Sequence, residues 1–218
     1  MIGNNWIALV LTLALALAWL RLNDYLAHRG VMSSPLSRKI IHIGTGPIYV
    51  LCWLFFTPAP ESRWLAALVS FAITVQFALI GLGLWKDPAA VAGMSRTGDP
   101  KEILRGPLFY GIVFVVLTLV YWKDSPIGIV ALMLLCGGDG LADVVGKRVK
   151  TAPIPWAPRK SVGGTLAVFV GGLVLTAVVL GVYALAGALP GGAPAPWLGI
   201  LVVILAGTLV ESLPFNDV

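Results

Sequence analysis

Long apolar runs alternate with short polar segments along the whole chain, and this alternation is the strongest feature of the sequence. A helix needs roughly 20 mostly apolar residues to cross the hydrocarbon core of a bilayer. Seven runs approach or exceed that length, and they cover residues 6–20, 40–56, 65–85, 108–122, 127–145, 162–189 and 197–213. The pattern predicts an all-α, polytopic membrane protein of about seven transmembrane helices, with residues 1–218 forming a single integral membrane domain.

Composition agrees with a bilayer as the solvent. Hydrophobic residues make up 58% of the chain and charged residues 11%, against roughly 25% charged residues in soluble domains. Met1 to Asn5 lack the Lys or Arg of a secretory signal, so we expect the first run to be a retained membrane anchor. Cys52 and Cys136 lie inside apolar runs, which favours small core residues over a disulfide or a metal site.

The basic residues predict an orientation in the membrane. Thirteen of the fifteen Lys and Arg residues fall in three connections, residues 21–39, 86–107 and 146–161, and the other two are Arg63 and Lys123. Because cytoplasmic loops carry the excess of Lys and Arg, we expect the N-terminus outside and the C-terminus inside. This bias explains the net charge of +5 without nucleic acid, for which the scattered basic residues lack interleaved aromatic residues.

The segment 137–148, which closes the fifth run, carries the strongest candidate chemistry. Asp139 and Asp143 are four residues apart, so on a helix they share one face and lie about 6 Å apart along the axis. Carboxylates at such a position usually have a partner, and Mg²⁺ commonly binds one or two carboxylates plus substrate phosphates. Gly138 allows close approach of a ligand, and Lys147 adds a cation for phosphate. A polar helix end with a Gly-rich cap gives the same pattern.

The segment 158–165 opens the sixth run with two cations, a hydroxyl and two glycines. A helix N-terminus offers free N–H groups and the positive end of its dipole, so it can bind an anion. Arg159, Lys160, Ser161 and Gly164 therefore form a candidate phosphate site. The order of a Walker A loop is absent, and interfacial snorkelling would also explain the two cations.

A third motif, residues 37–44, enters the second run. Arg38 and Lys39 lie four and three residues before His42, so the three side chains can share a helix face. We expect the two cations to contact a nucleotide or its phosphates and His42 to take part in catalysis. A lone membrane histidine is also often a packing residue.

Further candidates lie in the segment 95–107 and near the chain end. Arg96 is a candidate phosphate ligand, and Asp99, Glu102 and Arg105 are spaced by three, so they can form one polar stripe. Asp99 is expected to cap a helical turn that begins at Pro100. Glu211, near the end of the seventh run, is the last candidate.

These motifs, all at predicted cytoplasmic helix ends, resemble the CTP-dependent polyprenol kinase family. That family includes phytol, farnesol and dolichol kinases and a diacylglycerol kinase, and it is related in motif to the phosphatidate cytidylyltransferases. The resemblance runs from about Arg38 to Glu211. It implies transfer of the γ-phosphate of CTP to the hydroxyl of a membrane isoprenoid alcohol or diacylglycerol, with Mg²⁺ or a similar cation. It places Asp139 and Asp143 in the metal and nucleotide site and Lys160 on phosphate.

The resemblance departs at the chain end and leaves alternatives open. Family members usually continue past the last Glu into an Asp-Asn stretch and a further apolar segment, whereas this chain ends at residues 215–218, so a shortened C-terminus is expected. The general base is Asp139, Asp143 or His42, and the lipid acceptor is undecided. A cytidylyltransferase that releases pyrophosphate would use the same sites. A transporter or structural subunit would carry its charges at mid-membrane instead.

Overall fold

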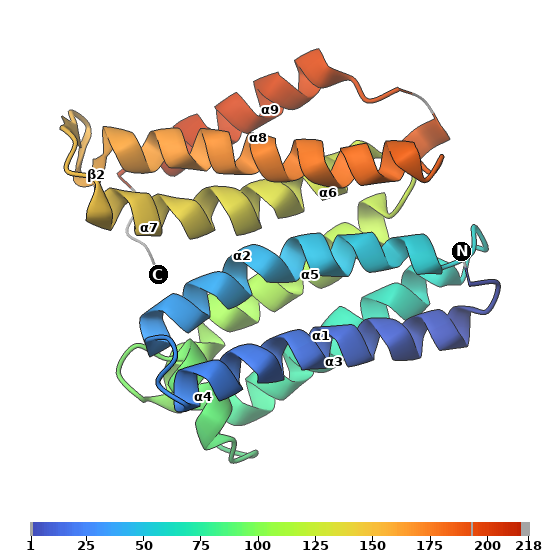
Figure 1. The fold of residues 1–218 in the computed structure, drawn as a ribbon, viewed down its shortest axis with the longest axis horizontal. Helices are drawn as coiled ribbons and strands as arrows, with labels where there is room; N and C mark the ends of the chain where they lie inside the picture. Colours follow the sequence, from blue (N-terminus) through green and yellow to red (C-terminus); the bar gives the residue numbers. More distant parts are fainter. Residues whose placement is uncertain (1, 193, 215–218) are drawn as a thin grey trace. The chain divides into compact units, whose positions relative to one another are not determined.

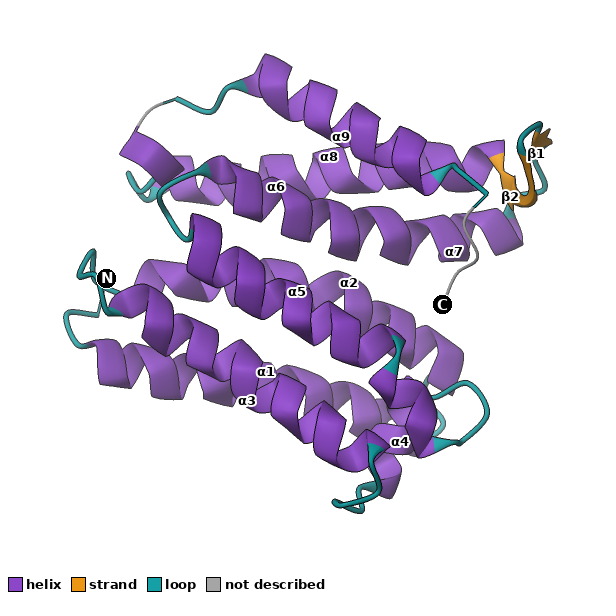
Figure 2. Ribbon diagram, turned by 180° about the vertical axis from the view of Figure 1, so that it is seen from behind, coloured by secondary structure: helices purple, strands orange, loops and turns teal. Residues whose placement is uncertain are grey.

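The computed structural model describes residues 2–192 and 194–214, and helices dominate this part of the chain (Figures 1 and 2). The long helices are α1 (Asn5–His28), α2 (Ser34–Cys52), α3 (Ser62–Gly81), α5 (Gly106–Tyr121), α8 (Val162–Leu185) and α9 (Trp197–Glu211). A further long helix is built from α6 (Pro126–Met133), the π-helical turn η3 (Leu134–Asp139) and α7 (Gly140–Arg148). The shorter elements are η1 (Trp53–Phe55), α4 (Pro88–Met94), η2 (Pro100–Leu104), β1 (Pro153–Ile154), β2 (Ala157–Ser161) and η4 (Pro190–Gly192).

The prediction of an all-α membrane protein is confirmed. Within the described residues, five helices are long and apolar enough to cross a membrane: Asn5–Ala27, Ser62–Gly81, Pro100–Tyr121, Pro126–Arg148 and Val162–Leu185. The shorter Trp197–Glu211 is also apolar, and α2 covers most of the remaining predicted run. The count of about seven therefore has looser support than the helical fold itself.

Helix ends extend past the apolar runs into the polar connections. α1 continues to His28 although its run ends near residue 20, and α2 begins at Ser34, six residues before its run. Polar side chains satisfy the backbone there, since Asn23 Nδ2 donates to the Trp19 carbonyl (2.8 Å) and Ser37 Oγ to the Asn23 carbonyl (3.2 Å). Hydropathy marks the bilayer crossing, whereas backbone hydrogen bonding decides where a helix ends.

The chain divides into two compact units. The first contains residues up to Ile41 and Cys52–Trp122, and the second contains His42–Leu51 and the chain from Lys123 onward. In the first unit, α3 packs against α5 at Thr74 and Gly111, where a Cβ on the glycine would collide with the threonine hydroxyl. Thr74 Oγ1 is satisfied by the Ser70 carbonyl at 2.7 Å. Small residues thus let these two backbones approach closely, as is typical of membrane helices.

The second unit packs the α6–η3–α7 helix against α8 through glycines on both helices. An ideal Cβ on Gly137 would lie 2.8 Å from the Gly171 carbonyl oxygen, and one on Gly138 would lie 3.0 Å from the Val168 carbonyl oxygen. Gly164 packs against Gly146 farther along the pair. The contact therefore runs from the π-turn to the last turn of α7. The candidate carboxylates Asp139 and Asp143 lie along this stretch.

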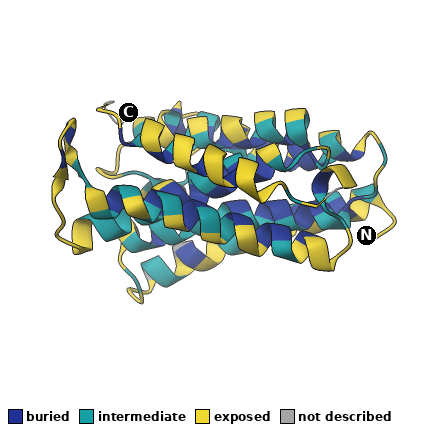
Figure 3. Cartoon of the chain, turned by 90° about the horizontal axis from the view of Figure 1, so that it is seen from above, coloured by how far each residue is buried: buried dark blue, intermediate teal, exposed yellow. Residues whose placement is uncertain are grey.

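Outward faces of the helices are apolar, and Figure 3 shows exposed and buried residues alternating along them. On α8, Leu166, Val170, Val174 and Val178 are exposed at a spacing of four. Between them, Val168 and Thr176 are buried. Such a stripe of exposed aliphatic side chains is the face that a bilayer would cover.

Candidate functional site

The centre of the candidate site lies where α2 meets the π-turn. His42 Nε2 lies 3.1 Å from the Leu135 carbonyl oxygen and 3.3 Å from Asp139 Oδ2. The Asp139 side chain is 57% exposed and that of His42 24%, so the carboxylate is the outer group and the imidazole the inner one. Two residues singled out from separate motifs are therefore in contact.

One helical turn farther, α7 carries the second predicted carboxylate. Asp143 Oδ1 accepts a salt bridge from Lys147 Nζ at 2.7 Å, within the same helix. The Asp143 side chain is 32% exposed and that of Lys147 72%, so the lysine ammonium reaches into solvent. Asp139, Asp143 and Lys147 thus follow one face of α7, as the i, i+4 spacing predicts.

The protein side chains alone would supply only part of the coordination shell of a divalent cation. Within residues 2–192 and 194–214, no group of three or more His, Cys, Asp or Glu side chains has the geometry of a metal site. Mg²⁺ does not need such a group, because it usually takes one or two carboxylates and completes its shell with substrate phosphates and water. Asp139 and Asp143 are the residues that would hold it, through hard oxygen ligands on one helix face.

The α8 N-terminus differs from the free anion site that its motif suggests. Ser161 is the N-cap residue and accepts from the Gly164 N–H at 3.1 Å. The Gly163 N–H donates to Thr151 Oγ1 at 2.8 Å, and the Val162 N–H donates to the Ala152 carbonyl at 3.0 Å. Because the first amides already have partners inside the chain, a phosphate here would depend on side chains.

Lys160 is held by the end of α9. Its Nζ donates to Glu211 Oε1 at 2.9 Å and also to the Glu211 backbone carbonyl. Both side chains are largely covered, 17% exposed for Lys160 and 29% for Glu211. Next to this pair, the Trp156 indole N–H donates to the Ser212 carbonyl at 3.0 Å. The β1–β2 hairpin is thereby fastened to the C-terminal end of α9, which is at the same end of the unit as α7 (Figure 1).

Three predicted cations lie outside these contacts. Arg38 and Lys39 are half-buried on the first turns of α2, in the same continuous helix as His42, and Lys39 has a partner. Arg159 is exposed on β2. The spacing of Arg38, Lys39 and His42 on one helix agrees with the sequence expectation.

The polar groups of the segment 95–105, in the first unit, bond to one another, while Ile103 is buried in a core cluster with Phe77 and Ile80 of α3. Glu102 accepts from the Arg96 N–H and from Thr97 Oγ1 at 3.1 Å, and Asp99 caps the turn η2 through the Lys101 N–H at 2.9 Å. The cap at Asp99 before Pro100 is as predicted. Glu102 lies inside η2, a short 3₁₀ turn, with Asp99 and Arg105 as its flanking cap residues, so the polar stripe of these three residues stays a prediction.

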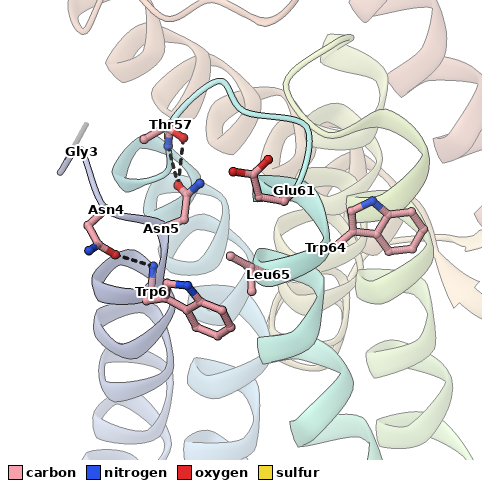
Figure 4. Close-up of a pocket in the computed structure, with 8 residues that line it drawn as sticks. All are labelled: Gly3, Asn4, Asn5, Trp6, Thr57, Glu61, Trp64 and Leu65. Atoms are coloured by element: carbon pink, nitrogen blue, oxygen red, sulfur yellow. Dashed lines mark hydrogen bonds between the residues drawn. The ribbon is translucent and has the colours of Figure 1, made fainter.

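Several partners of the site carry no sequence signal of their own. The Leu135 carbonyl, the Thr151 hydroxyl and the Trp156–Ser212 bond come from apolar or loop residues. One sequence feature could have indicated the close helix packing, namely the glycines at 137, 138 and 140. Glycine is frequent where helices approach closely. A pocket was also not predicted, and Figure 4 shows its lining: Gly3, Asn4, Asn5, Trp6, Thr57, Glu61, Trp64 and Leu65. It belongs to the first unit and carries none of the predicted site residues.

The sequence is similar to plant kinases that act on isoprenoid alcohols. It is 39% identical to a probable chloroplastic phytol kinase of Triticum aestivum, over 97% of this chain and 70% of that protein. It is 34% identical to chloroplastic phytol kinase 1 of Arabidopsis thaliana, over 89% and 64% of the two chains. It is 36% identical to the chloroplastic farnesol kinase of the same plant, over 86% and 61%.

Other comparisons add no second family. No protein-family model matches the sequence, and no solved structure matches it. The plant kinases align with most of this chain. Residues 215–218, where a shortened C-terminus was expected, lie outside the described part of the structure. On the strength of these long alignments, the chain belongs to the polyprenol kinase family, the family of the phytol and farnesol kinases.

Proposed function

We propose that this protein is a lipid-alcohol kinase that transfers the γ-phosphate of CTP to the hydroxyl of an isoprenoid alcohol such as phytol or farnesol. The observation that carries the proposal is the contact of His42 with Asp139, one helical turn before Asp143, in a chain that belongs to the polyprenol kinase family. Phosphoryl transfer asks mainly for positioning and charge neutralisation. Carboxylates, cations and an apolar surround are the groups such a reaction requires.

Each group has a role in the proposed mechanism. Asp139 and Asp143 are the residues that would hold Mg²⁺, which would neutralise charge on the phosphates of CTP. Lys147 reaches into solvent beside Asp143, whereas Gly138 is packed against Val168 of α8. Other phosphate contacts come from the side chains of the remaining candidates, Arg38, Lys39, Arg96, Arg159, Lys160 and Ser161, since the Gly164 amide is bonded to Ser161.

The lipid enters sideways from the bilayer, and its hydroxyl meets the nucleotide at the polar helix ends. Thirteen of the fifteen Lys and Arg residues belong to the connections that carry these motifs, so the proposed active site and C-terminus lie on the cytoplasmic side and the N-terminus outside. The proton of the hydroxyl passes to a carboxylate of the site, Asp139 or Asp143. A positioned base of this kind contributes about 10²- to 10⁴-fold.

The test uses purified protein in detergent with Mg²⁺, [γ-³²P]CTP and a panel of phytol, farnesol, a long polyprenol, diacylglycerol and phosphatidate. We expect label in an organic-extractable lipid phosphate, with phytol or farnesol preferred. Asp139→Asn should reduce transfer by about 10²-fold or more, whereas Glu61→Gln, which removes a carboxylate from the pocket of the first unit, should not. Label released as pyrophosphate with phosphatidate would show a cytidylyltransferase instead. No transfer to any lipid would refute the proposal.

A further inference from the structure

We propose that His42 is a positioning residue for Asp139. Its Nε2 carries the proton and donates hydrogen bonds to the Asp139 carboxylate and the Leu135 carbonyl. This inference rests on the proposed function, because it assigns a role within the same site. It decides between two roles that the sequence left open for His42, proton acceptor and support.

Hydrogen-bond chemistry at Nε2 fixes where the proton is. The Leu135 carbonyl oxygen at 3.1 Å and Asp139 Oδ2 at 3.3 Å are both acceptors. A carbonyl oxygen has no proton to give, so this contact requires Nε2 to be the donor. Nε2 must therefore carry the hydrogen, and the lone pair that a base would use at that atom is absent. A base acting through Nε2 would have to face two oxygen acceptors without a proton between them.

The π-turn brings the two acceptors to one nitrogen. In a regular α-helix the Leu135 carbonyl would bond the amide of Asp139, four residues on. Here residues Leu134–Asp139 form a π-helical turn, in which the wider ring shifts that pairing. The carbonyl of Leu135 and the side chain of Asp139 consequently both reach the imidazole. Such turns are rare in proteins as a whole, but many of those known lie at functional sites. This agrees with a role of the turn in setting the contact.

Glycines on both helices make the approach possible. An ideal Cβ on Gly140 would collide with Ile43 Cγ1 and lie 3.2 Å from His42 Cδ2. On the other helix, a Cβ on Gly46 would collide with the Cys136 thiol. α2 is therefore seated on the π-turn at two points, one turn apart, and His42 lies at the end of this contact beside Asp139.

Exposure separates the two roles. Asp139, at 57% exposed, faces the side from which a nucleotide and cation arrive, whereas His42 is more covered. A carboxylate has about four acceptor positions, so a bond from His42 can set its rotation without using all of them. Partners of this kind, which orient a metal-binding group, typically change activity or metal affinity by about 10- to 100-fold when removed.

The decisive experiment compares His42→Leu with His42→Gln in the full-length protein. The Gln amide nitrogen can replace Nε2–H as a donor, but it cannot accept a proton. We expect His42→Leu to lower kcat by about 30-fold or more, with KM for the alcohol changed little, and His42→Gln to recover most of that loss. Mn²⁺ binding, followed by electron paramagnetic resonance without nucleotide, should weaken in His42→Leu and recover in His42→Gln.

The outcomes separate the role of His42 from the proposed function. If His42→Gln is as inactive as His42→Leu while both unfold at the wild-type temperature, His42 is not a donor support and the inference is overturned. Wild-type activity in His42→Leu overturns it as well. Absence of transfer by the wild-type protein instead refutes the kinase, and the Mn²⁺ comparison then still decides whether His42 orients Asp139.

A second variant tests the same contact from the glycine side. Gly140→Ala should push α2 away from the π-turn and reproduce the loss of kcat seen in His42→Leu. Gly181→Ala is the matched control, because Gly181 lies on α8 with nothing within 4 Å of an added Cβ. Equal kcat for Gly140→Ala and Gly181→Ala, with both proteins folded, would mean that seating α2 on the turn does not orient the site.

Discussion

The polar end of the α6–η3–α7 helix and the segment before α5 contain similar residues but are organised in opposite ways. At the helix end, the contacts join residues far apart in the sequence: His42 meets a carbonyl 93 positions away, and Lys160 meets Glu211 across 51. In the segment 95–105, Glu102 reaches no farther than the Arg96 amide, six residues before it. The polar contacts of the first region depend on helix packing, whereas those of the second stay within the segment, which is joined to α3 through the buried Ile103.

This difference separates two ways of making a polar site in a membrane protein. A self-closed loop is determined by local caps, so it forms wherever the chain supplies Asp, Glu and a turn residue. A site assembled from several helices exists only while those helices are packed. Damage to helix contacts should therefore abolish the site assembled from several helices and spare the polar contacts within the loop.

The largest effect is expected at the glycine contact between the α6–η3–α7 helix and α8. Gly137→Ala places a Cβ 2.6 Å from Leu175 Cδ1 and 2.8 Å from the Gly171 carbonyl oxygen. Because one of these neighbours is backbone, we expect a loss of about 1–3 kcal/mol in the free energy of unfolding. Thermal unfolding in detergent measures it, and Gly199→Ala, on α9 with open space around it, is the control. A Gly137→Ala protein as stable as the control would mean that the two helices can separate without cost.

Next in size is the effect of removing the second carboxylate. Asp143→Asn should lower kcat about 100-fold and raise the Mg²⁺ concentration needed for half-maximal activity. Its stability should change by less than about 1 kcal/mol, because the pair with Lys147 is largely solvated. Lys147→Met breaks the same ion pair and is the matched comparison, since it leaves both carboxylates in place. Equal Mg²⁺ requirements in the two variants would assign the effect to the ion pair and not to metal binding.

Features set by local sequence could be predicted, whereas features set by the packing of helices could not. The helices and the cap at Asp99 depend on local periodicity, and the structure agrees with both, whereas the pairing of Asp139 and Asp143 in one site stays a prediction. The π-turn and the His42–Leu135 contact depend on how two helices pack, which no local pattern encodes. The α8 N-terminus was misjudged for the same reason, because Thr151, twelve residues before Gly163, already accepts the amide expected to be free.

Lys160 shows where this limit affects function. Its position beside Ser161 and Gly164 suggests a phosphate ligand, yet its ammonium is bonded to Glu211, both at the carboxylate and at the backbone carbonyl. A cation at a helix C-terminus is favourable by itself. Whether Lys160 also binds phosphate stays a prediction, and Glu211 becomes the residue through which it can be tested.

A smaller effect is expected when this pair is broken. Glu211→Gln and Lys160→Met should each lower the free energy of unfolding by about 1–2 kcal/mol, because the partly covered pair fastens β2 to α9. If Lys160 also contacts phosphate, Lys160→Met should raise KM for CTP by about tenfold more than Glu211→Gln does. Steady-state kinetics with both variants separate the roles. Identical KM values for CTP in the two variants would mean that Lys160 stabilises the fold and does not bind phosphate.

The smallest and most local effect is expected in the self-closed segment. Glu102→Ala removes the acceptor for the Arg96 and Thr97 amides, so hydrogen exchange at these two amides should accelerate by roughly tenfold. The melting temperature should not fall, because the packing of α3 and α5 does not use this carboxylate. Lys101→Ala is the control, since Lys101 is exposed and contributes its backbone N–H to the Asp99 cap.

This last variant tests the comparison itself. If Glu102→Ala lowers the melting temperature as much as Gly137→Ala, the segment 95–105 is not a local structure but part of the packed helices. If only exchange changes, the segment is ordered by its own carboxylate. A rise of about threefold in KM for CTP on top of that change would then indicate that Arg96 binds the nucleotide through a loop ordered in advance.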